Sequence, residues 1–260
     1  MFAPSVVLLP ADLLLPDALW LVLTAGLTSL MTATLGIGGG VLLLVVMAQL
    51  VPIAALIPVH GLVQLGSNGN RALMTRRHID WSLCRRFLFG GLLGALLASL
   101  VVVQLPLELI QLAVGGFILW MVWGAKPAAK TLTPIKTLLA GGLTTFLSMF
   151  VGATGPLVAA FVHRHSHDKM QTVATFATAM TGQHLLKGVV FSVVGFSFVD
   201  WLPLIAAMIL SGMLGTWIGL NLLHRVSSAW FNRLFRVVVT LLALRLLWQA
   251  GELLLPRLLG

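Results

Sequence analysis

The stretch GIGGG at residues 36–40 separates two apolar blocks, at residues 18–35 and 41–51. The second block is too short to cross a bilayer alone, because a spanning helix needs about 20 apolar residues. A similar break, GATGP at residues 152–156, accompanies a short apolar block at residues 155–162. Short apolar segments beside such breaks are typical of half-helices or re-entrant hairpins. The sequence therefore predicts two interrupted helices in one membrane protein.

The composition of the chain agrees with a membrane location. Hydrophobic residues make up 59% and charged residues 9% of its 260 residues, with a mean hydropathy of +1.04. A soluble domain carries about 25% charged residues, so lipid rather than water must solvate this chain. The remaining apolar blocks complete an all-α integral membrane protein and lie at residues 53–70, 83–103, 106–124, 135–152, 170–190, 202–223 and 231–250.

The basic residues predict how the spans are oriented. Lys and Arg number 16 against seven Asp and Glu, a formal net charge of +9. Short loops rich in Lys and Arg stay in the cytoplasm, which places residues 71–86 and 126–136 inside. Asp12 and Asp17 precede the first span without a basic neighbour, so we predict the N-terminus and, by alternation, the C-terminus outside a bacterial inner (plasma) membrane. Orientation thus explains the positive charge, and nucleic-acid binding is not required.

The two halves of the chain resemble each other. GLT at residues 26–28 recurs at residues 142–144, a shift of 142 − 26 = 116, and DW at residues 80–81 recurs at residues 200–201. Because the loop charges start the first half outside and the second half inside, the sequence predicts two repeats of inverted topology. Inverted repeats are a signature of secondary transporters, whose substrate binds near the midplane where interrupted helices meet.

These repeats define the predicted domains. The first transmembrane repeat covers residues 18–124, a cytoplasmic linker covers residues 125–134, and the second, inverted repeat covers residues 135–250. Each repeat is expected to contain a Gly-interrupted helical hairpin and about three spanning helices. The breaks are either re-entrant hairpins or pairs of short crossings.

The two breaks are candidate anion-binding sites. A helix that starts inside the bilayer leaves its first N–H groups unpaired and points the positive end of its dipole into the protein. A bound anion accepts hydrogen bonds from these N–H groups and complements the positive end of the dipole. Glycine has no side chain and so lets the oxygens of the anion approach the backbone. We therefore predict substrate contacts at Gly38, Gly39 and Gly40 and at Thr154 and Gly155. The alternative is a plain kink or a close helix contact.

Polar side chains within the spans extend this candidate site. Polar groups at membrane depth are costly and normally face a cavity or a polar partner. Three alternatives remain open. Arg71 could belong to the basic cytoplasmic cluster, and His60 and His184 could form interhelical hydrogen bonds. Lys187 could snorkel outward. The further predicted substrate-binding residues are Thr34, His60, Gln64, Ser67, Asn68, Arg71, Gln183, His184 and Lys187.

Other chemistries have little support in the sequence. All seven carboxylates lie near loops or span ends, which argues against transport of sodium or metal cations. If protons are coupled to transport, His60 or His184 would titrate, because imidazole does so near neutral pH. The HRHSHD loop at residues 163–168 has the spacing of a solvated loop rather than of a metal site. Because GxSxG, P-loop and HExxH motifs do not occur, we expect neither an enzyme nor a bound cofactor.

The chain resembles the TauE/SafE sulfite exporter family of membrane anion permeases. The resemblance rests on TLGIGGG at residues 34–40, on its partner at residues 152–156 and on the two Asp-Trp pairs, and it extends from about Leu21 to Trp248. It implies a permease for sulfite, sulfonates or related small anions. The second break departs from the fuller glycine pattern of the first, so the two halves need not contribute equally.

Together these features predict a secondary anion transporter that works by alternating access. An anion channel whose pore is lined by the same residues is the alternative. The expected partners are a small anionic substrate and membrane lipid. A homodimer, the direction of transport and the coupling ion are left open.

Overall fold

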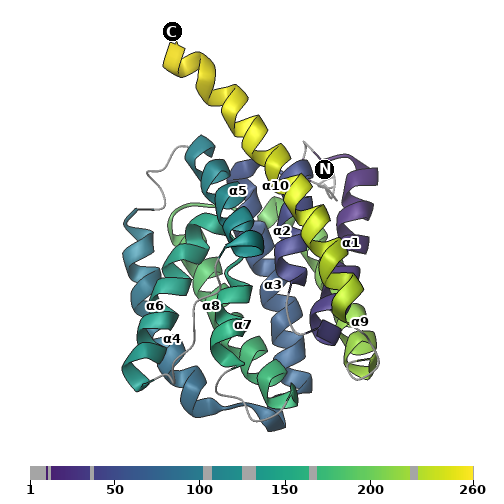
Figure 1. Cartoon of the computed structure of the whole chain (residues 1–260), viewed down its shortest axis with the longest axis vertical. Helices are drawn as coiled ribbons and strands as arrows, with labels where there is room; N and C mark the ends of the chain where they lie inside the picture. Colours follow the sequence, from purple (N-terminus) through teal and green to yellow (C-terminus); the bar gives the residue numbers. More distant parts are fainter. Residues whose placement is uncertain are drawn as a thin grey trace, which may run out of the picture.

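Every regular element in the described part of the chain is a helix, as predicted, because a backbone in lipid must satisfy its polar groups within each segment. The computed structural model describes residues 10, 13–35, 38–101, 107–124, 133–163, 169–222 and 228–259 (Figure 1). The first half contains α1 (Leu15–Leu35), α2 (Gly39–Leu50), α3 (Ile53–Met74), the 3₁₀ turn η1 (Arg76–His78), α4 (Trp81–Ser99) and α5 (Leu107–Trp123). The second half contains α6 (Pro134–Val151), α7 (Gly155–Val162), α8 (Lys169–Val193), the 3₁₀ turn η3 (Val199–Trp201), α9 (Leu202–Leu222) and α10 (Ser228–Leu259).

Among the residues that the structure describes, four helical segments are long and apolar enough to cross a membrane: α1, α4, α6 and the segment Val199–Leu222 that contains α9. The helices α2 and α7, which follow the glycine breaks, have 12 and 8 residues and are therefore too short to cross alone. Gly36 and Ile37 of the first break, and residues 125–132 of the predicted linker, lie outside the described residues.

One glycine at each break has a backbone conformation that other residues rarely adopt. Gly38 precedes α2 with φ of 103°, and Gly152 ends α6 with φ of 80°. A side chain at either position would be strained, because positive φ brings Cβ close to the backbone carbonyl. The chain therefore turns at these two points without a continuous helix.

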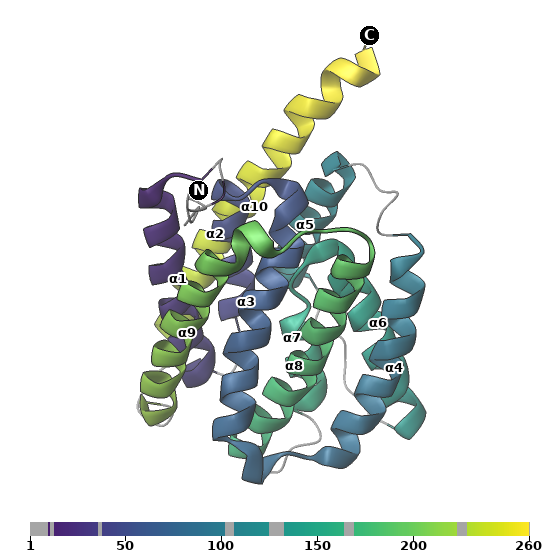
Figure 2. The same cartoon turned by 180° about the vertical axis from the view of Figure 1, so that it is seen from behind.

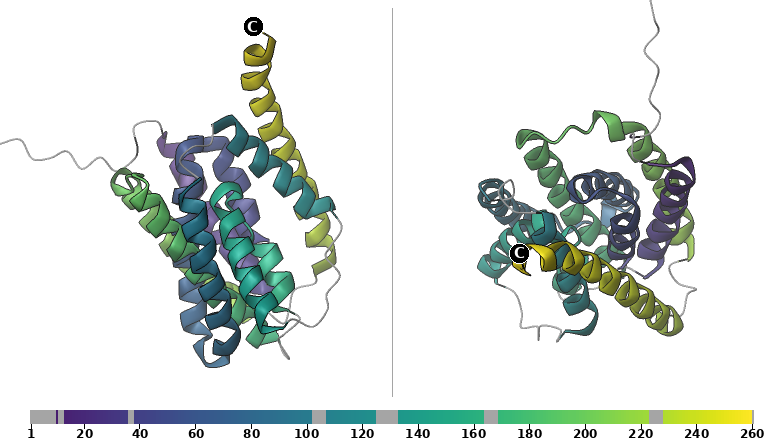
Figure 3. Two further views of the ribbon diagram at one scale, coloured as in Figure 1. Left: turned by 90° about the vertical axis from the view of Figure 1, so that its left-hand side faces the viewer. Right: turned by 90° about the horizontal axis from the view of Figure 1, so that it is seen from above.

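The helices pair across the two halves of the sequence. α1 packs mainly against α9, α4 against α6, α3 against α8, and α5 against α10. Figure 2 shows α3 and α8 between the α1–α9 pair on one side and the α4–α6 pair on the other. Figure 3 shows α10 crossing the bundle obliquely, with its last turns beyond the other helices. Each outer pair therefore joins one helix from either half.

Glycines bring the outer pairs into backbone contact. A Cβ atom on Gly215 of α9 would collide with the carbonyl oxygen of Gly26 of α1, and one on Gly94 of α4 would collide with the carbonyl oxygen of Gly142 of α6. Small residues commonly allow such close approach in membrane helices. Both outer pairs are thus held by the same kind of contact, a glycine of one helix against a backbone carbonyl of the other.

Contacts along the helices give their relative directions. Gly26 and Leu30 of α1 meet α9 at Gly215 and Gly219, so these two helices run the same way. In the central pair, Gly61 of α3 faces Lys187 of α8, whereas Gly69, farther along α3, faces Thr181, earlier in α8. The central helices α3 and α8 are therefore antiparallel. Figure 1 shows α1 beginning and α10 ending at the same end of the bundle.

We predict that Gly215→Val lowers the unfolding free energy by about 1–3 kcal/mol, the usual cost of forcing extra atoms into a packed interface. Thermal unfolding of the purified protein in detergent measures the change. Gly116→Val is the matched control, because Gly116 is exposed in helix α5 and a Cβ there meets nothing within 4 Å. Equal melting temperatures for the two variants would contradict close packing of α1 on α9.

Candidate functional site

The start of α2 lies deep in the bundle, against α1 and α3. The Cβ position of Gly39 would coincide with the carbonyl of Thr28 and the hydroxyl of Thr32 on α1, and that of Gly40 would lie 3.3 Å from Oε1 of Gln64 on α3. Side-chain oxygens commonly cap helix N-termini, but the N-cap Gly38 has no side chain and makes no such bond. The first backbone N–H groups of α2 therefore have no side-chain cap, and they lie beside polar groups of α3.

A continuous polar stripe on α3 faces this helix start. Nδ2 of Asn68 donates to the carbonyl and Oε1 of Gln64, at 2.9 and 3.0 Å, and Nη1 of Arg71 donates to Oδ1 of Asn68 at 3.1 Å. Oγ of Ser67 lies 2.8 Å from Oγ of Ser29 on α1. These bonds hold the Arg71 guanidinium back along α3 toward the interior of the protein.

The second break is held by Gln183 of α8. Oγ1 of Thr154 donates to Oε1 of Gln183 at 3.0 Å, while Nε2 of Gln183 donates to Oγ1 of Thr144 at 3.3 Å and of Thr145 at 3.1 Å on α6. Thr154 is the N-cap of α7 but makes no side-chain bond to that helix. One amide thus ties α6, the break and α8 together.

Lys187 and the two histidines join the halves of the site. Nζ of Lys187 donates to the carbonyl oxygen of Gly152 in the second break at 2.7 Å. Nε2 of His60 donates to the carbonyl of Gly40 at 2.9 Å, and its ring meets that of His184 edge to face, with centroids 6.1 Å apart. Nδ1 of each histidine is buried without a hydrogen-bond partner.

The charges of this region are unbalanced. Arg71 is 1% exposed and Lys187 is 0% exposed, yet the buried residues of the described chain include no Asp or Glu. Burying an ionised group without a counter-charge is costly, and the neutral partners seen here offset only part of that cost. An anion among these groups would supply the missing negative charge.

The comparison with protein families also indicates that the ligand is an anion. Residues 21–246 match the family described as sulfite exporter TauE/SafE. The chain belongs to this family. No curated protein and no solved structure gives a significant match. Membership in a family of membrane sulfite exporters identifies the chain as an integral membrane transporter of a small anion, and it confirms the resemblance seen in the sequence.

In this TauE/SafE chain, the predicted polar residues fall into two groups that meet at His60 and His184. All of their side chains are buried. Two predicted residues are less engaged: the hydroxyl of Thr34 bonds back to carbonyls of its own helix, and Gly155 has the apolar Phe176 and Met180 as its nearest neighbours. The remaining predicted residues lie at the two breaks or on α3 and α8.

Several polar residues of this region were missed by the sequence analysis. Ser29, Thr144 and Thr145 bond directly to predicted site residues, and Thr216 of α9 is fully buried with an unpartnered hydroxyl. Isolated Ser and Thr are common in apolar spans, so their presence alone carries little signal. The predicted repeat offered one signal for two of these residues, because Ser29 and Thr145 are related by the shift of 116.

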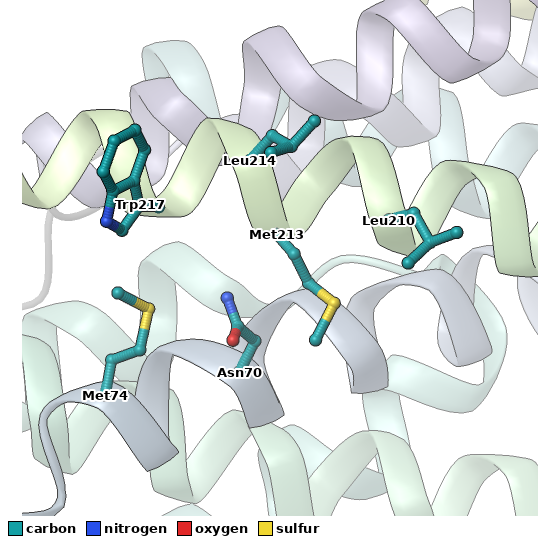
Figure 4. A pocket seen from close by; sticks show the side chains of 6 residues that line it. All are labelled: Asn70, Met74, Leu210, Met213, Leu214 and Trp217. Atoms are coloured by element: carbon teal, nitrogen blue, oxygen red, sulfur yellow. The ribbon is translucent and has the colours of Figure 1, made fainter.

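The predicted site residues lie apart from two hollows on the surface of the TauE/SafE protein. The larger hollow, about 470 Å³, lies between α3 and α9 and is lined by Asn70, Met74, Leu210, Met213, Leu214 and Trp217 (Figure 4). A smaller one of about 300 Å³ lies between α3 and α8 and is lined largely by apolar side chains. None of the predicted site residues lines either hollow.

The described residues also bear on metal binding. They contain no group of three or more His, Cys, Asp or Glu able to hold a metal ion. His163 caps α7, and residues 164–168 of the histidine-containing loop lie outside the described part.

We predict that Gln183→Leu lowers the unfolding free energy by about 1–3 kcal/mol, because it leaves buried threonine hydroxyls without their partner. Thermal unfolding in detergent measures the effect. Gln111→Leu in α5, where the glutamine is only partly buried, is the control. If both variants melt together, Gln183 does not hold the second break.

Proposed function

We propose that this protein is a secondary transporter that moves small sulfur-containing or organic anions, such as sulfite or sulfonates, across a bacterial inner membrane by alternating access. The observation that carries the proposal is the pair of buried cations, Arg71 and Lys187, in an interior whose described residues include no buried carboxylate. Such an interior attracts an anion and repels a cation. The family match supports the same substrate class.

The binding groups suit a compact oxyanion with several acceptor oxygens. Arg71 offers planar, paired N–H donors, and Lys187 offers a point charge with further protons beyond its bond to Gly152. The N-termini of α2 and α7 add backbone donors and positive dipole ends. His184 and His60 add ring nitrogens, and they would also carry a proton if the transport cycle consumes one.

We further propose that residues 18–124 and 135–250 are inverted repeats that exchange helices. Equivalent pairs support this: α1 with α9 mirrors α6 with α4, and the contact of Gly26 with Gly215 mirrors that of Gly142 with Gly94. The bond between Ser29 and Ser67 likewise mirrors the bond between Thr145 and Gln183. A pseudo-two-fold axis in the membrane plane that relates α3 to α8 would make these two helices antiparallel, which agrees with their contacts.

This arrangement suggests how access alternates. The outer pairs α1–α9 and α4–α6 are each closely packed through glycines, so each can move as one body against the central helices. Opening between an outer pair and the α3–α8 centre on one side exposes the buried groups to that side only. The helix starts at the two breaks then remain with the substrate while the surrounding pairs move.

Replacing the buried lysine tests the proposal directly. We predict that Lys187→Met reduces sulfite flux in proteoliposomes at least tenfold while leaving the melting temperature unchanged or higher, because an apolar side chain of similar length removes an unpaired buried charge. Lys136→Met, at an exposed position of α6, should keep wild-type flux. Full flux through Lys187→Met would remove Lys187 from the substrate path.

Counterflow distinguishes a carrier from a channel. We predict that proteoliposomes preloaded with unlabelled sulfite take up labelled sulfite faster than empty ones, and that the uptake rate saturates with sulfite concentration. The reason is that the binding site of a carrier must return to the outer face before it can take up the next anion. Uptake that is linear in concentration and unaffected by preloading would replace the carrier with an anion channel.

A further inference from the structure

Two buried polar atoms near the first break have no partner. Oγ1 of Thr216 on α9 and Nε of Arg71 on α3 both lack a hydrogen-bond partner, although Thr216 is 0% and Arg71 is 1% exposed. An unsatisfied buried donor lowers the stability of the folded state. Native proteins seldom keep such a cost without a function.

The packing of α3 on α9 brings these two residues to the same depth. A Cβ on Gly66 would meet Ile209, and a Cβ on Gly212 would lie 3.8 Å from Cβ of Ser67, so the two helices run in the same direction. Figure 4 shows the same register farther along, where Met74 lies opposite Trp217. Arg71 and Thr216 each follow the Ser67–Gly212 contact by four residues, about one helical turn.

The start of α2 reaches this depth as well. The Cβ position of Gly212 also lies 2.9 Å from Oγ of Ser29 on α1, and Gly39 at the start of α2 abuts Thr32, three residues beyond Ser29. Residues three or four apart lie on one face of a helix. The N-terminus of α2, Arg71 and Thr216 are therefore at a similar depth, close to the seam between α1, α3 and α9.

Lys187 occupies a different depth. Its side chain packs over Gly61 of α3, ten residues before Arg71, which corresponds to roughly 15 Å along the helix axis. Its titratable neighbours are His60 and His184, and its hydrogen bond goes to Gly152 in the second break. The two buried cations thus belong to separate sets of neighbours.

We propose that the transporter contains two anion stations in series. The first station consists of Arg71, Thr216 and the N-terminus of α2, and the second consists of Lys187, His184 and the N-terminus of α7. Thr216 is a binding residue of the first station, and its hydroxyl donates to the anion there. This inference rests on the proposed function, because the anion at both stations is the transported substrate.

The stations differ at one equivalent position. The shift of 121 that relates Gly94 to Gly215 pairs Thr216 with Ala95, since 216 − 121 = 95. Ala95 is buried in α4 and carries no hydroxyl. The first station thus has a side-chain donor that the second lacks at the equivalent place, so the two stations should bind the same anion with different affinities.

Titration calorimetry with sulfite tests the proposal on the purified full chain. We expect two sulfite ions per chain for the wild type. Thr216→Val should weaken one of these sites by about tenfold or more, the effect of losing a hydrogen bond to a charged group, and leave the other unchanged. Lys187→Met should abolish the other site. Thr181→Val in α8, whose hydroxyl bonds to a carbonyl of its own helix, should keep both.

The possible failures are distinguishable. A single sulfite ion per chain, lost in both Arg71→Met and Lys187→Met, would overturn the two stations but leave the transporter intact. Wild-type binding at both sites in Thr216→Val would remove Thr216 from the first station and contradict the proposal. If the wild type neither binds nor transports sulfite, thiosulfate or a sulfonate, the proposed function itself fails. Because valine matches threonine in shape and no protein hydrogen bond is lost, Thr216→Val should fold normally.

Discussion

The structure depends on how the interior tolerates two positive charges. Arg71 and Lys187 are buried on α3 and α8, and their partners in the protein are an asparagine side chain and a backbone carbonyl. A folded state with these charges and no counter-ion carries an electrostatic cost that hydrophobic packing must offset. Such a cost is acceptable in a transporter, because a binding site that is already satisfied by the protein has little affinity for substrate.

The glycine breaks complement these charges because they present backbone donors rather than side chains. Donors on the backbone are fixed in position and add no titratable group, and the breaks expose them at the inner ends of α2 and α7. The side chains around them form a network that fixes the breaks: Gln183 holds Thr154, and His60 holds the carbonyl of Gly40. Rigid donors of this kind lose little entropy when an anion binds.

Much of this arrangement was predictable because lipid imposes strict rules on sequence. The helices begin and end close to the predicted apolar blocks, and the polar stripe on α3 was visible from its helical spacing. What could not be predicted was the tertiary pairing. The proposed repeat relates α1 to α6, but nothing local to Gly26 specifies that its partner is Gly215 rather than a glycine of its own half. Thr216 was overlooked for the same reason, since its burial without a partner depends on the packing of α9 against α1 and α3 and not on its neighbours along the chain.

The exchange of helices between halves has a consequence for synthesis. α1 is synthesised well before its main packing partner, α9. Until then the glycine face of α1 must be shielded by lipid, by the insertion machinery or by a transient neighbour. Neither half of this chain can reach its final packing until the other half has been synthesised.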